Sequence, residues 1–433
     1  MRDVILSLII FGSLPIILVR PFLGIIMWSW VAYMVPHKLT WGFAFNYPFA
    51  QAIAIATLAG WLLSKERKTL PINAMTVLLL MLTAWVSLTT VFAIMPDFAY
   101  GKWERSAKIL LMTFVTIPLL VGRKRIDALV WVIALSVGFY GIKGGLFLLR
   151  GAGDALMIGP AGGFFGDNNA FALTLIMVVP LMRYLQMQSK RLWIRLGLGA
   201  AMLLSLVSVV GTHSRGGFLA AAAMCLTMVM MSRRRVVFGS VLLIGVIVGI
   251  PFLPGSWVER METIQNYEED GSAMGRIDAW TFAWRHSLDR PIGGGFLINR
   301  AHDLFISYVP NASDSRAFHS VYFEVLGEHG FIGLGIFLAL LGTTVVYANA
   351  VRTAIKGRED LQWADDLVRM LLVCMVGYAV GGAFLNLAFF DLYYHLIALI
   401  LCTKLTVEAE LGAAAKPRDG PALQHSLAMP RHE

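Results

Sequence analysis

Charged residues are scarce in this chain. Only 15% of its 433 residues are Asp, Glu, Lys or Arg, and 58% are hydrophobic, whereas soluble domains carry about 25% charged residues. The deficit comes from repeated apolar runs of roughly 17 to 23 residues, the length that crosses a bilayer core. A soluble globular protein is therefore excluded, and the sequence predicts an all-α integral membrane protein.

Cysteine is scarce as well, and no metal-binding pattern is present. Cys225, Cys374 and Cys402 all fall inside apolar runs and lack the spacing of metal ligands, which excludes a disulfide framework and a zinc site. No pair of carboxylates stands out either. Glycosidases generally need two carboxylates, so the sequence does not indicate a glycosidase. We expect no metal and no cofactor.

The apolar runs predict about 12 or 13 transmembrane helices. Arg20-Pro21 interrupts the first pair, which counts either as one broken span or as two. The first run lacks the small-residue pattern of a cleaved signal peptide. The runs lie near residues 3–19, 21–35, 48–63, 72–94, 107–121, 126–149, 168–187, 193–211, 216–231, 235–253, 330–350, 370–387 and 389–406.

Basic residues cluster in short loops between alternate runs, which predicts that these loops face the cytoplasm. The formal net charge of +9 then reflects membrane topology, and no nucleic-acid partner is expected. In this interpretation residues 1–406 form a polytopic transmembrane domain and residues 407–433 a disordered cytoplasmic tail. The clusters are Lys65 to Lys68, Arg123 to Arg125, Lys190 to Arg195, Arg233 to Arg235, and Arg352 to Arg358.

One long polar segment, residues 254–318, interrupts the apolar pattern on the opposite, periplasmic side. Loops of this length inside compact folds are usually functional or disordered, and Trp257, Trp280 and Trp284 indicate that this one folds back onto the protein. Its basic residues are all arginines, and acidic residues outnumber them. We predict a partly helical loop that forms a lid over the active site.

His319 is the candidate catalytic residue. It precedes a predicted helix over roughly 320–350, and the positive end of a helix favours a neutral imidazole. A neutral imidazole can act as a general base at physiological pH. The alternative is a histidine that only caps the helix. Glu324 is five residues further on, so it should not face His319, and it is a possible supporting residue.

Arg215 and Arg276 are the candidate anion-binding residues. Arg215 lies in Thr212-His213-Ser214-Arg215-Gly216-Gly217, a tight break between two spans, where glycines allow close approach of a ligand to the backbone. A guanidinium group binds phosphate in a bidentate manner. The alternatives are an interfacial arginine at position 215 that reaches lipid headgroups, and a local salt bridge between Arg276 and Asp278.

Four further residues near the outer face are weaker candidates. Arg105 and Lys108 lie at the outer start of another predicted span. Asp167 and Asn168 end a glycine-rich outer loop, where one of them could hydrogen-bond sugar hydroxyls. The alternative for Asp167 is to cap the following helix.

The motifs together resemble the O-antigen ligase/polymerase superfamily. Ala317-Phe318-His319-Ser320 with Glu324, Glu328, Gly330 and Gly333 is similar to the family signature, although Ser320 stands where asparagine is common. Ser214-Arg215-Gly216, and Gly275-Arg276 with Trp280, Pro291 and the following glycines, resemble two other family elements. The stretches 33–42 and 267–276 are similar to the branch of O-glycosylation ligases associated with exosortase systems.

The resemblance implies a GT-C-like, metal-independent, inverting glycosyltransferase in the bacterial inner membrane. Such an enzyme takes a glycan from undecaprenyl diphosphate at the periplasmic face. In O-antigen ligases the acceptor is a sugar of the lipid A core. Carried over by resemblance, His319 is the base, and Arg215 and Arg276 hold the donor diphosphate. The expected partners are the lipid-linked donor, the lipid A core and membrane lipids.

Three alternatives to an O-antigen ligase remain at this stage. A protein O-glycosylation ligase and an O-antigen polymerase share the same motifs and differ in the acceptor. A transporter is the more distant alternative, but transporters favour ionisable groups at mid-membrane and paired repeats of broken helices. Here the ionisable candidates gather at one rim and no internal repeat is evident.

Overall fold

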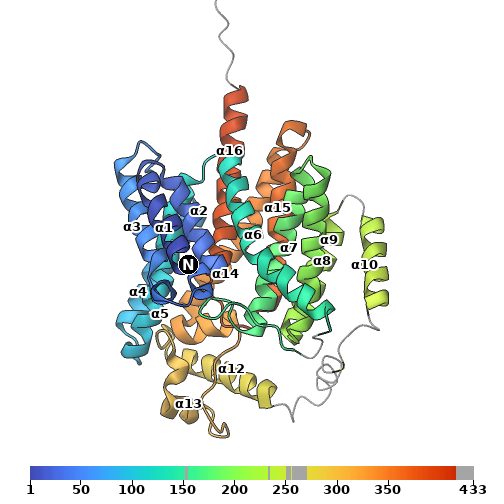
Figure 1. Ribbon diagram of the computed structural model, residues 1–433. Coiled ribbons are helices and arrows are strands. Elements are labelled where there is room, and N and C mark those ends of the chain that lie inside the picture. Colours follow the sequence, from blue (N-terminus) through green and yellow to red (C-terminus); the bar gives the residue numbers. More distant parts are fainter. Residues whose placement is uncertain (152–154, 233–234, 250–254, 256–270, 416–433) are drawn as a thin grey trace, which may run out of the picture.

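The chain folds into a bundle of α-helices. The computed structural model describes residues 1–151, 155–232, 235–249, 255 and 271–415, and within these ranges the regular structure is α-helix and short 3-10 helix. Figure 1 shows the long helices side by side, with α12 and α13 beyond one end of the bundle. We call this end the capped end. Trp257, the rest of the predicted loop before residue 271 except residue 255, and residues 416–433 lie outside the described residues.

The described residues contain fifteen α-helices, which occur at every apolar run predicted from the sequence. Their bounds are α1 Arg2–Val19, α2 Pro21–Met34, α3 Phe49–Leu63, α4 Ala74–Val91, α5 Pro96–Leu119, α6 Arg123–Leu149, α7 Asn168–Gln188, α8 Leu192–Gly211, α9 Arg215–Met231, α10 Arg235–Gly249, α12 Gly271–Asp289, α13 His302–Tyr308, α14 Val321–Ala354, α15 Gln362–Gly382 and α16 Asp391–Ala415.

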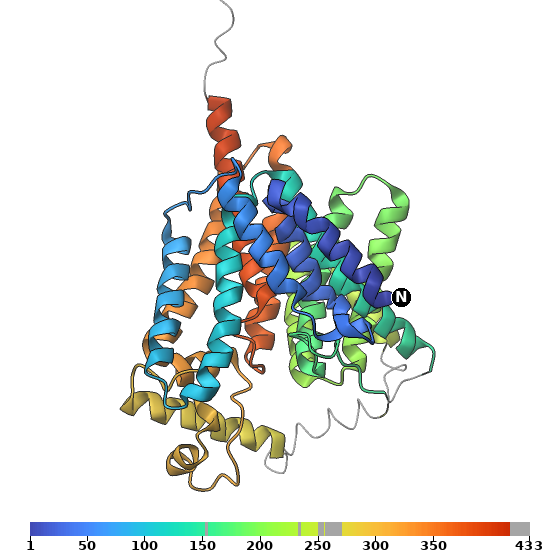
Figure 2. The ribbon, with the colours of Figure 1, turned by 60° about the vertical axis from the view of Figure 1, so that its left-hand side comes forward.

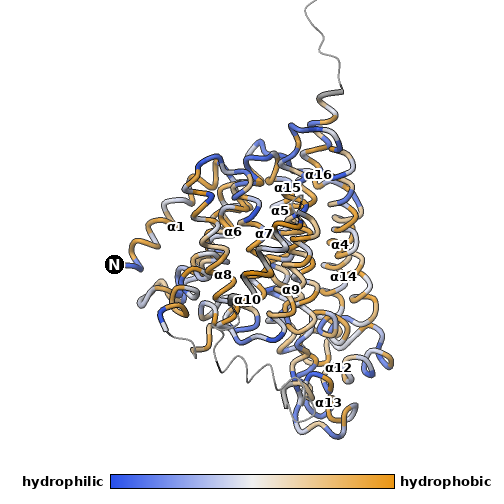
Figure 3. The backbone as a smooth tube through the Cα atoms, turned by 90° about the vertical axis from the view of Figure 1, so that its right-hand side faces the viewer, coloured by the Kyte–Doolittle hydropathy of each residue, from blue (hydrophilic) through white to orange (hydrophobic). Residues whose placement is uncertain are grey.

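This is a multi-pass membrane protein. Six of the described helices, α1, α4, α6, α7, α8 and α14, are long and apolar enough to cross a bilayer, and α2, α3 and α9 are shorter apolar helices. Figure 3 shows apolar residues along the middle of the bundle and polar residues towards its ends. The pair of apolar runs at Arg20-Pro21, predicted as one broken span or as two, forms two helices, and Pro21 begins α2 at its first position.

Three helix boundaries differ clearly from the prediction: α15 begins at Gln362 rather than near residue 370, and the start of α5 and the end of α16 differ as well. α5 begins at Pro96 rather than near residue 107. Its first turns are polar, so no apolar run in the sequence marks them. α16 continues to Ala415, past the predicted start of the tail at residue 407. Val407 is buried at 1% exposure, and Lys404 pairs with Glu408 one turn away. These contacts and a run of alanines, which favour helix, extend α16.

α14 is sharply kinked at Gly330, where φ is 66° and ψ is −169°. The loop Pro291–Gly295 enters the kink: the Phe331 N–H donates to the Pro291 carbonyl (3.1 Å), and the Gly294 N–H donates to the Gly327 carbonyl (3.0 Å). A Cβ atom at Gly330 would lie 1.8 Å from the Pro291 carbonyl oxygen. Glycine at position 330 therefore leaves the space in which the loop Pro291–Gly295 packs into the kink.

Residues 271–318 form a small subdomain at the capped end. α12, the 3-10 helix Ile298–Arg300 and α13 enclose a core of their own, separate from the core of the bundle. In Figures 1 and 2, α12 lies across the end of the bundle. The core residues are Ala279, Phe282, Ala283, Ile298, Ala301, Phe305, Val309 and Phe318.

Candidate functional site

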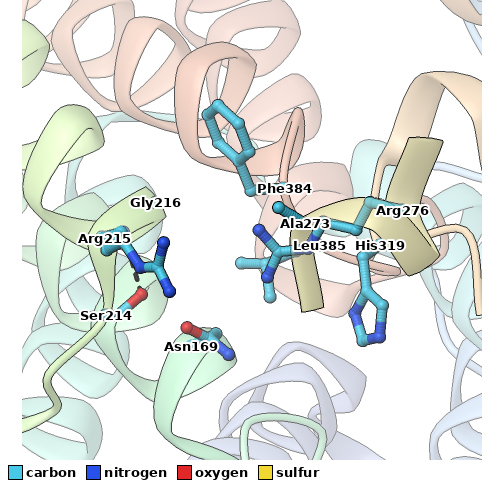
Figure 4. Close-up of a pocket in the computed structure, with 10 residues that line it drawn as sticks. Asn169, Ser214, Arg215, Gly216, Ala273, Arg276, His319, Phe384 and Leu385 are labelled. Atoms are coloured by element: carbon cyan, nitrogen blue, oxygen red, sulfur yellow. Dashed lines mark hydrogen bonds between the residues drawn. The ribbon is translucent and has the colours of Figure 1, made fainter. Parts of the chain in front are cut away.

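A pocket of about 160 Å³ lies at the capped end and brings Arg215, Arg276 and His319 together. These three residues come from α9, from α12 and from the segment before α14, so the pocket joins the bundle to the subdomain. Figure 4 shows Arg215 and Arg276 extending into the pocket from opposite sides, with His319 beside Arg276. The other lining residues are Asn169, Ser214, Gly216, Gly217, Ala273, Phe384 and Leu385.

Arg215 is the first residue of α9. The Ser214 hydroxyl caps this helix by accepting the Gly217 N–H (2.9 Å), so the positive end of the helix dipole faces the pocket. A Cβ atom at Gly216 would lie 2.9 Å from Phe384 Cβ, and one at Gly217 would lie 2.7 Å from Ala172 Cβ. The two glycines therefore allow α9 to pack closely against its neighbours. This packing accounts for both glycines without a ligand near the backbone.

Arg276 and His319 are connected through Trp280. The Trp280 indole N–H donates to the Phe318 carbonyl (2.7 Å), and the indole ring stacks on Phe323 with ring centroids 5.0 Å apart. Trp280 lies one turn after Arg276 on α12, while Phe318 immediately precedes His319. The relative positions of guanidinium and imidazole therefore depend on these contacts. Asp278 is two residues from Arg276 on a helix, where side chains do not face each other.

His319 stands before the N-terminus of α14, as the sequence predicted. Its backbone has a φ of 46°, in the left-handed region that is uncommon for residues other than glycine. Desolvation by the surrounding protein and, second, the charge of Arg276 lower the pKa of His319, although Asp167 and Glu324 oppose the shift. Because the pKa is lowered, the imidazole is neutral at physiological pH and can accept a proton.

The glycine-rich loop before α7 contributes a residue other than those predicted. The Asp167 carboxylate caps α7 by accepting the N–H groups of Asn169 and Ala170, both at 3.0 Å. The Asn168 amide donates to the Thr212 carbonyl (2.9 Å) and so connects α7 to the segment before Ser214. Asn169, which the sequence did not single out, lines the pocket.

Arg105 and Lys108 do not line the pocket. Arg105 donates to the Gly101 carbonyl of its own helix (3.2 Å). Lys108 pairs with Glu104 at 2.6 Å, and both side chains are about half exposed. The structure thus places these two candidates on the exposed side of α5.

Lys102, which sequence analysis missed, joins Glu324 and Glu328 in a buried charge cluster. Its ammonium group lies 2.6 Å from Glu324 and 2.7 Å from Glu328, and the two carboxylates are 2% and 1% exposed. The backbone N–H groups of Ala388 and Leu297 also donate to Glu324 (3.1 Å) and Glu328 (2.9 Å), respectively. Glu324 is thus bound to Lys102, and its charge acts on His319 from a neighbouring position. The overlooked signal is two carboxylates four residues apart in an apolar helix.

An apolar groove adjoins the pocket. It has a volume of about 520 Å³, is formed by α8, α9 and α10, and shares Ser214 with the pocket. Side chains that line it include Leu206, Val209, Phe218, Ala222, Leu226 and Leu243. A molecule with a charged group and an apolar tail could occupy both spaces at once.

Comparison with known proteins divides the chain into two matched regions. Residues 1–190 match a family of unknown function (DUF5935). Residues 200–338, which include Arg215, Arg276 and His319, match the family described as O-Antigen ligase. A search of curated proteins found no match.

Proposed function

We propose that the protein, whose residues 200–338 match the family described as O-Antigen ligase, is an inverting glycosyltransferase that uses a lipid-linked donor. The donor is a glycan on undecaprenyl diphosphate, and the acceptor is a sugar hydroxyl of the lipid A core. The observation that carries the proposal is the pocket, in which two guanidinium groups and a neutral imidazole face one space.

The proposed site is at the periplasmic face of the bacterial inner membrane. The basic loops gather at the end of the bundle opposite to the pocket: Arg125 binds Glu66 through two contacts of 3.0 and 2.6 Å, and Arg123 binds Gln188 at 3.0 Å. Basic loops face the cytoplasm, so this arrangement favours a periplasmic pocket. Twelve or thirteen of the helices then cross the membrane, since α1 and α2 count as one span or two.

The diphosphate is held by Arg215 and Arg276. Guanidinium groups form paired, charge-assisted hydrogen bonds with phosphate oxygens, and the N-terminus of α9 adds positive potential at the same place. As the glycosidic bond breaks, negative charge grows on the leaving diphosphate. Fixed positive groups stabilise this developing charge, which is usually the largest single contribution to catalysis. We propose that these charges make a metal ion unnecessary.

His319 acts as the general base. It takes the proton of the acceptor hydroxyl while the acceptor oxygen forms a bond to the anomeric carbon. The bond from that carbon to the diphosphate oxygen breaks on the opposite face, which inverts the anomeric configuration. The diphosphate leaves as a stabilised anion and needs no acid.

The apolar groove along α8, α9 and α10 suits the prenyl tail of the donor. The groove and the pocket share Ser214, so the tail enters the bilayer where the diphosphate meets Arg215. The donor's amphiphilic character thus matches two adjoining spaces of opposite polarity.

A transfer assay with separate acceptors tests the proposal. Purified protein is incubated with undecaprenyl-diphosphate glycan, a chelator and one acceptor: lipid A core, a second lipid-linked glycan or a protein. We expect transfer to lipid A core in the presence of chelator and none with the His319→Gln variant. Transfer to another acceptor alone would instead identify a polymerase or a protein O-glycosylation ligase. Absence of transfer to all three would contradict the proposed chemistry.

A further inference from the structure

α12 has two apolar faces, and among the described residues one of them packs into a protein core while the other is largely exposed. Its inner face contributes Ala279, Phe282 and Ala283 to the core of the subdomain. The opposite face carries a stripe of four large apolar residues that are 37% to 57% exposed: Met274, Ile277, Trp284 and Leu288. Spacings of three, seven and four residues return to the same side of a helix, so these side chains form one continuous surface.

The stripe is continuous with the membrane-facing surface of α14. The Trp284 ring packs edge-on against Phe331, with ring centroids 5.5 Å apart. The next residue of α14, Ile332, is exposed, as is Leu338 one to two turns further on. α14 is among the helices that are long and apolar enough to cross the bilayer. Trp284 therefore stands beside the part of α14 that enters the membrane, just after the kink at Gly330.

We infer that α12 is an interfacial helix whose stripe inserts into the membrane leaflet at the capped end. α12 lies across the end of the bundle, not along it (Figure 2), which is the orientation of a helix in the plane of the interface. Such helices bury an apolar face at the boundary between headgroups and acyl chains, where tryptophan is enriched. The partner of the stripe is the lipid bilayer.

This placement has a consequence for Arg276, which lies on α12 and lines the pocket. A helix seated in the interface holds Arg276 at a fixed depth, close to the layer in which lipid phosphates lie. The role of this depth in donor binding rests on the proposed function, whereas the insertion of α12 into the membrane interface does not.

Fluorescent labels on single cysteines test the inference without an activity assay. The full-length protein carries Cys225→Ala, because Cys374 and Cys402 are buried and Cys225 is only partly so. A polarity-sensitive label is attached after Ile277→Cys or Leu288→Cys, and the protein is placed in nanodiscs with or without spin-labelled lipid. The matched control is Ser307→Cys, an exposed position on α13 of the same subdomain.

We expect blue-shifted emission and several-fold stronger quenching by spin-labelled lipid at positions 277 and 288 than at position 307. Equal access of a water-soluble quencher to all three labels would overturn the inference. Protection at 277 and 288 that depends on protein concentration, without quenching by lipid, would also overturn it, because the stripe would then bind a second copy of the chain.

Discussion

Two groups of charged side chains lie near the start of α14, and they differ in whether they line a cavity. In the first, Lys102 bonds to Glu324 and Glu328, and backbone N–H groups complete both carboxylates. In the second, Arg215 and Arg276 line a cavity whose described walls contain no carboxylate. A buried cluster of ion pairs ties helices together, whereas guanidinium groups that line a cavity are accessible to an anionic ligand. Charge near the candidate site is therefore not by itself a sign of function.

His319→Gln should have the largest effect on activity. Glutamine retains hydrogen-bonding capacity but cannot accept the proton, and general-base catalysis typically contributes about 10²- to 10⁴-fold in rate. We expect transfer to fall by that factor while the affinity for undecaprenyl diphosphate stays unchanged. Turnover and donor binding measured on the same preparation check this. Normal turnover in the variant would show that His319 is not the base.

Arg276→Lys should reduce turnover by about 10²- to 10³-fold, the usual loss for one preorganised donor to a developing anion. Lysine keeps the charge but loses the planar fork that binds two phosphate oxygens, so it should not rescue activity. Arg290→Lys is the matched control, because Arg290 lies just beyond α12 and donates to the Phe92 carbonyl. Equal losses in the two variants would point to a general effect on the subdomain.

Lys102→Met should lower the thermal stability of the protein, which would distinguish the buried charge cluster from the pocket. Removing one partner of a buried ion pair costs about 3 to 5 kcal/mol because the other charges stay buried. Lys108→Met, on the same helix, removes only an exposed pair with Glu104, and exposed pairs of this kind contribute little to stability. Thermal unfolding in detergent should show a clear loss for the first variant and little change for the second. Similar unfolding temperatures would mean that the cluster does not hold α5 to α14.

The pH dependence of transfer should give the smallest effect. Because the pKa of His319 is lowered, the imidazole remains neutral at pH values at which an ordinary histidine, with a pKa of about 6.5, is half protonated. Turnover should therefore fall only as the pH drops below that value. Arg276→Gln should move the midpoint upwards, since it removes a neighbouring positive charge. A midpoint above 6.5 in the native protein would contradict the assignment.

The sequence predicted the helices of the bundle well, because an apolar run inside a bilayer must form a helix to satisfy its backbone hydrogen bonds. It also predicted that His319 stands before a helix. It did not predict the kink at Gly330, because the loop that fills the kink is contributed by residues 291–295, far from it in the chain.

The structure brings some of the candidate residues together and places others apart. Arg215, Arg276 and His319 line one pocket, whereas Arg105 and Lys108 lie outside it and Asn169, next to Asp167 and Asn168, lines it. These differences concern which face of a helix a side chain occupies, which the sequence alone does not determine. Lys102 was missed because its partners are more than two hundred residues away, so the local pattern of the two carboxylates does not identify the lysine that binds them.

A double-mutant cycle on donor binding tests the central claim most directly. Affinity for undecaprenyl diphosphate is measured for the native protein, Arg215→Ala, Arg276→Ala and the double variant. If both guanidinium groups hold one diphosphate, the losses are non-additive, because residues that share a ligand are energetically coupled. Additive losses, or binding that is unchanged in either single variant, would mean that the two arginines do not act on the same group.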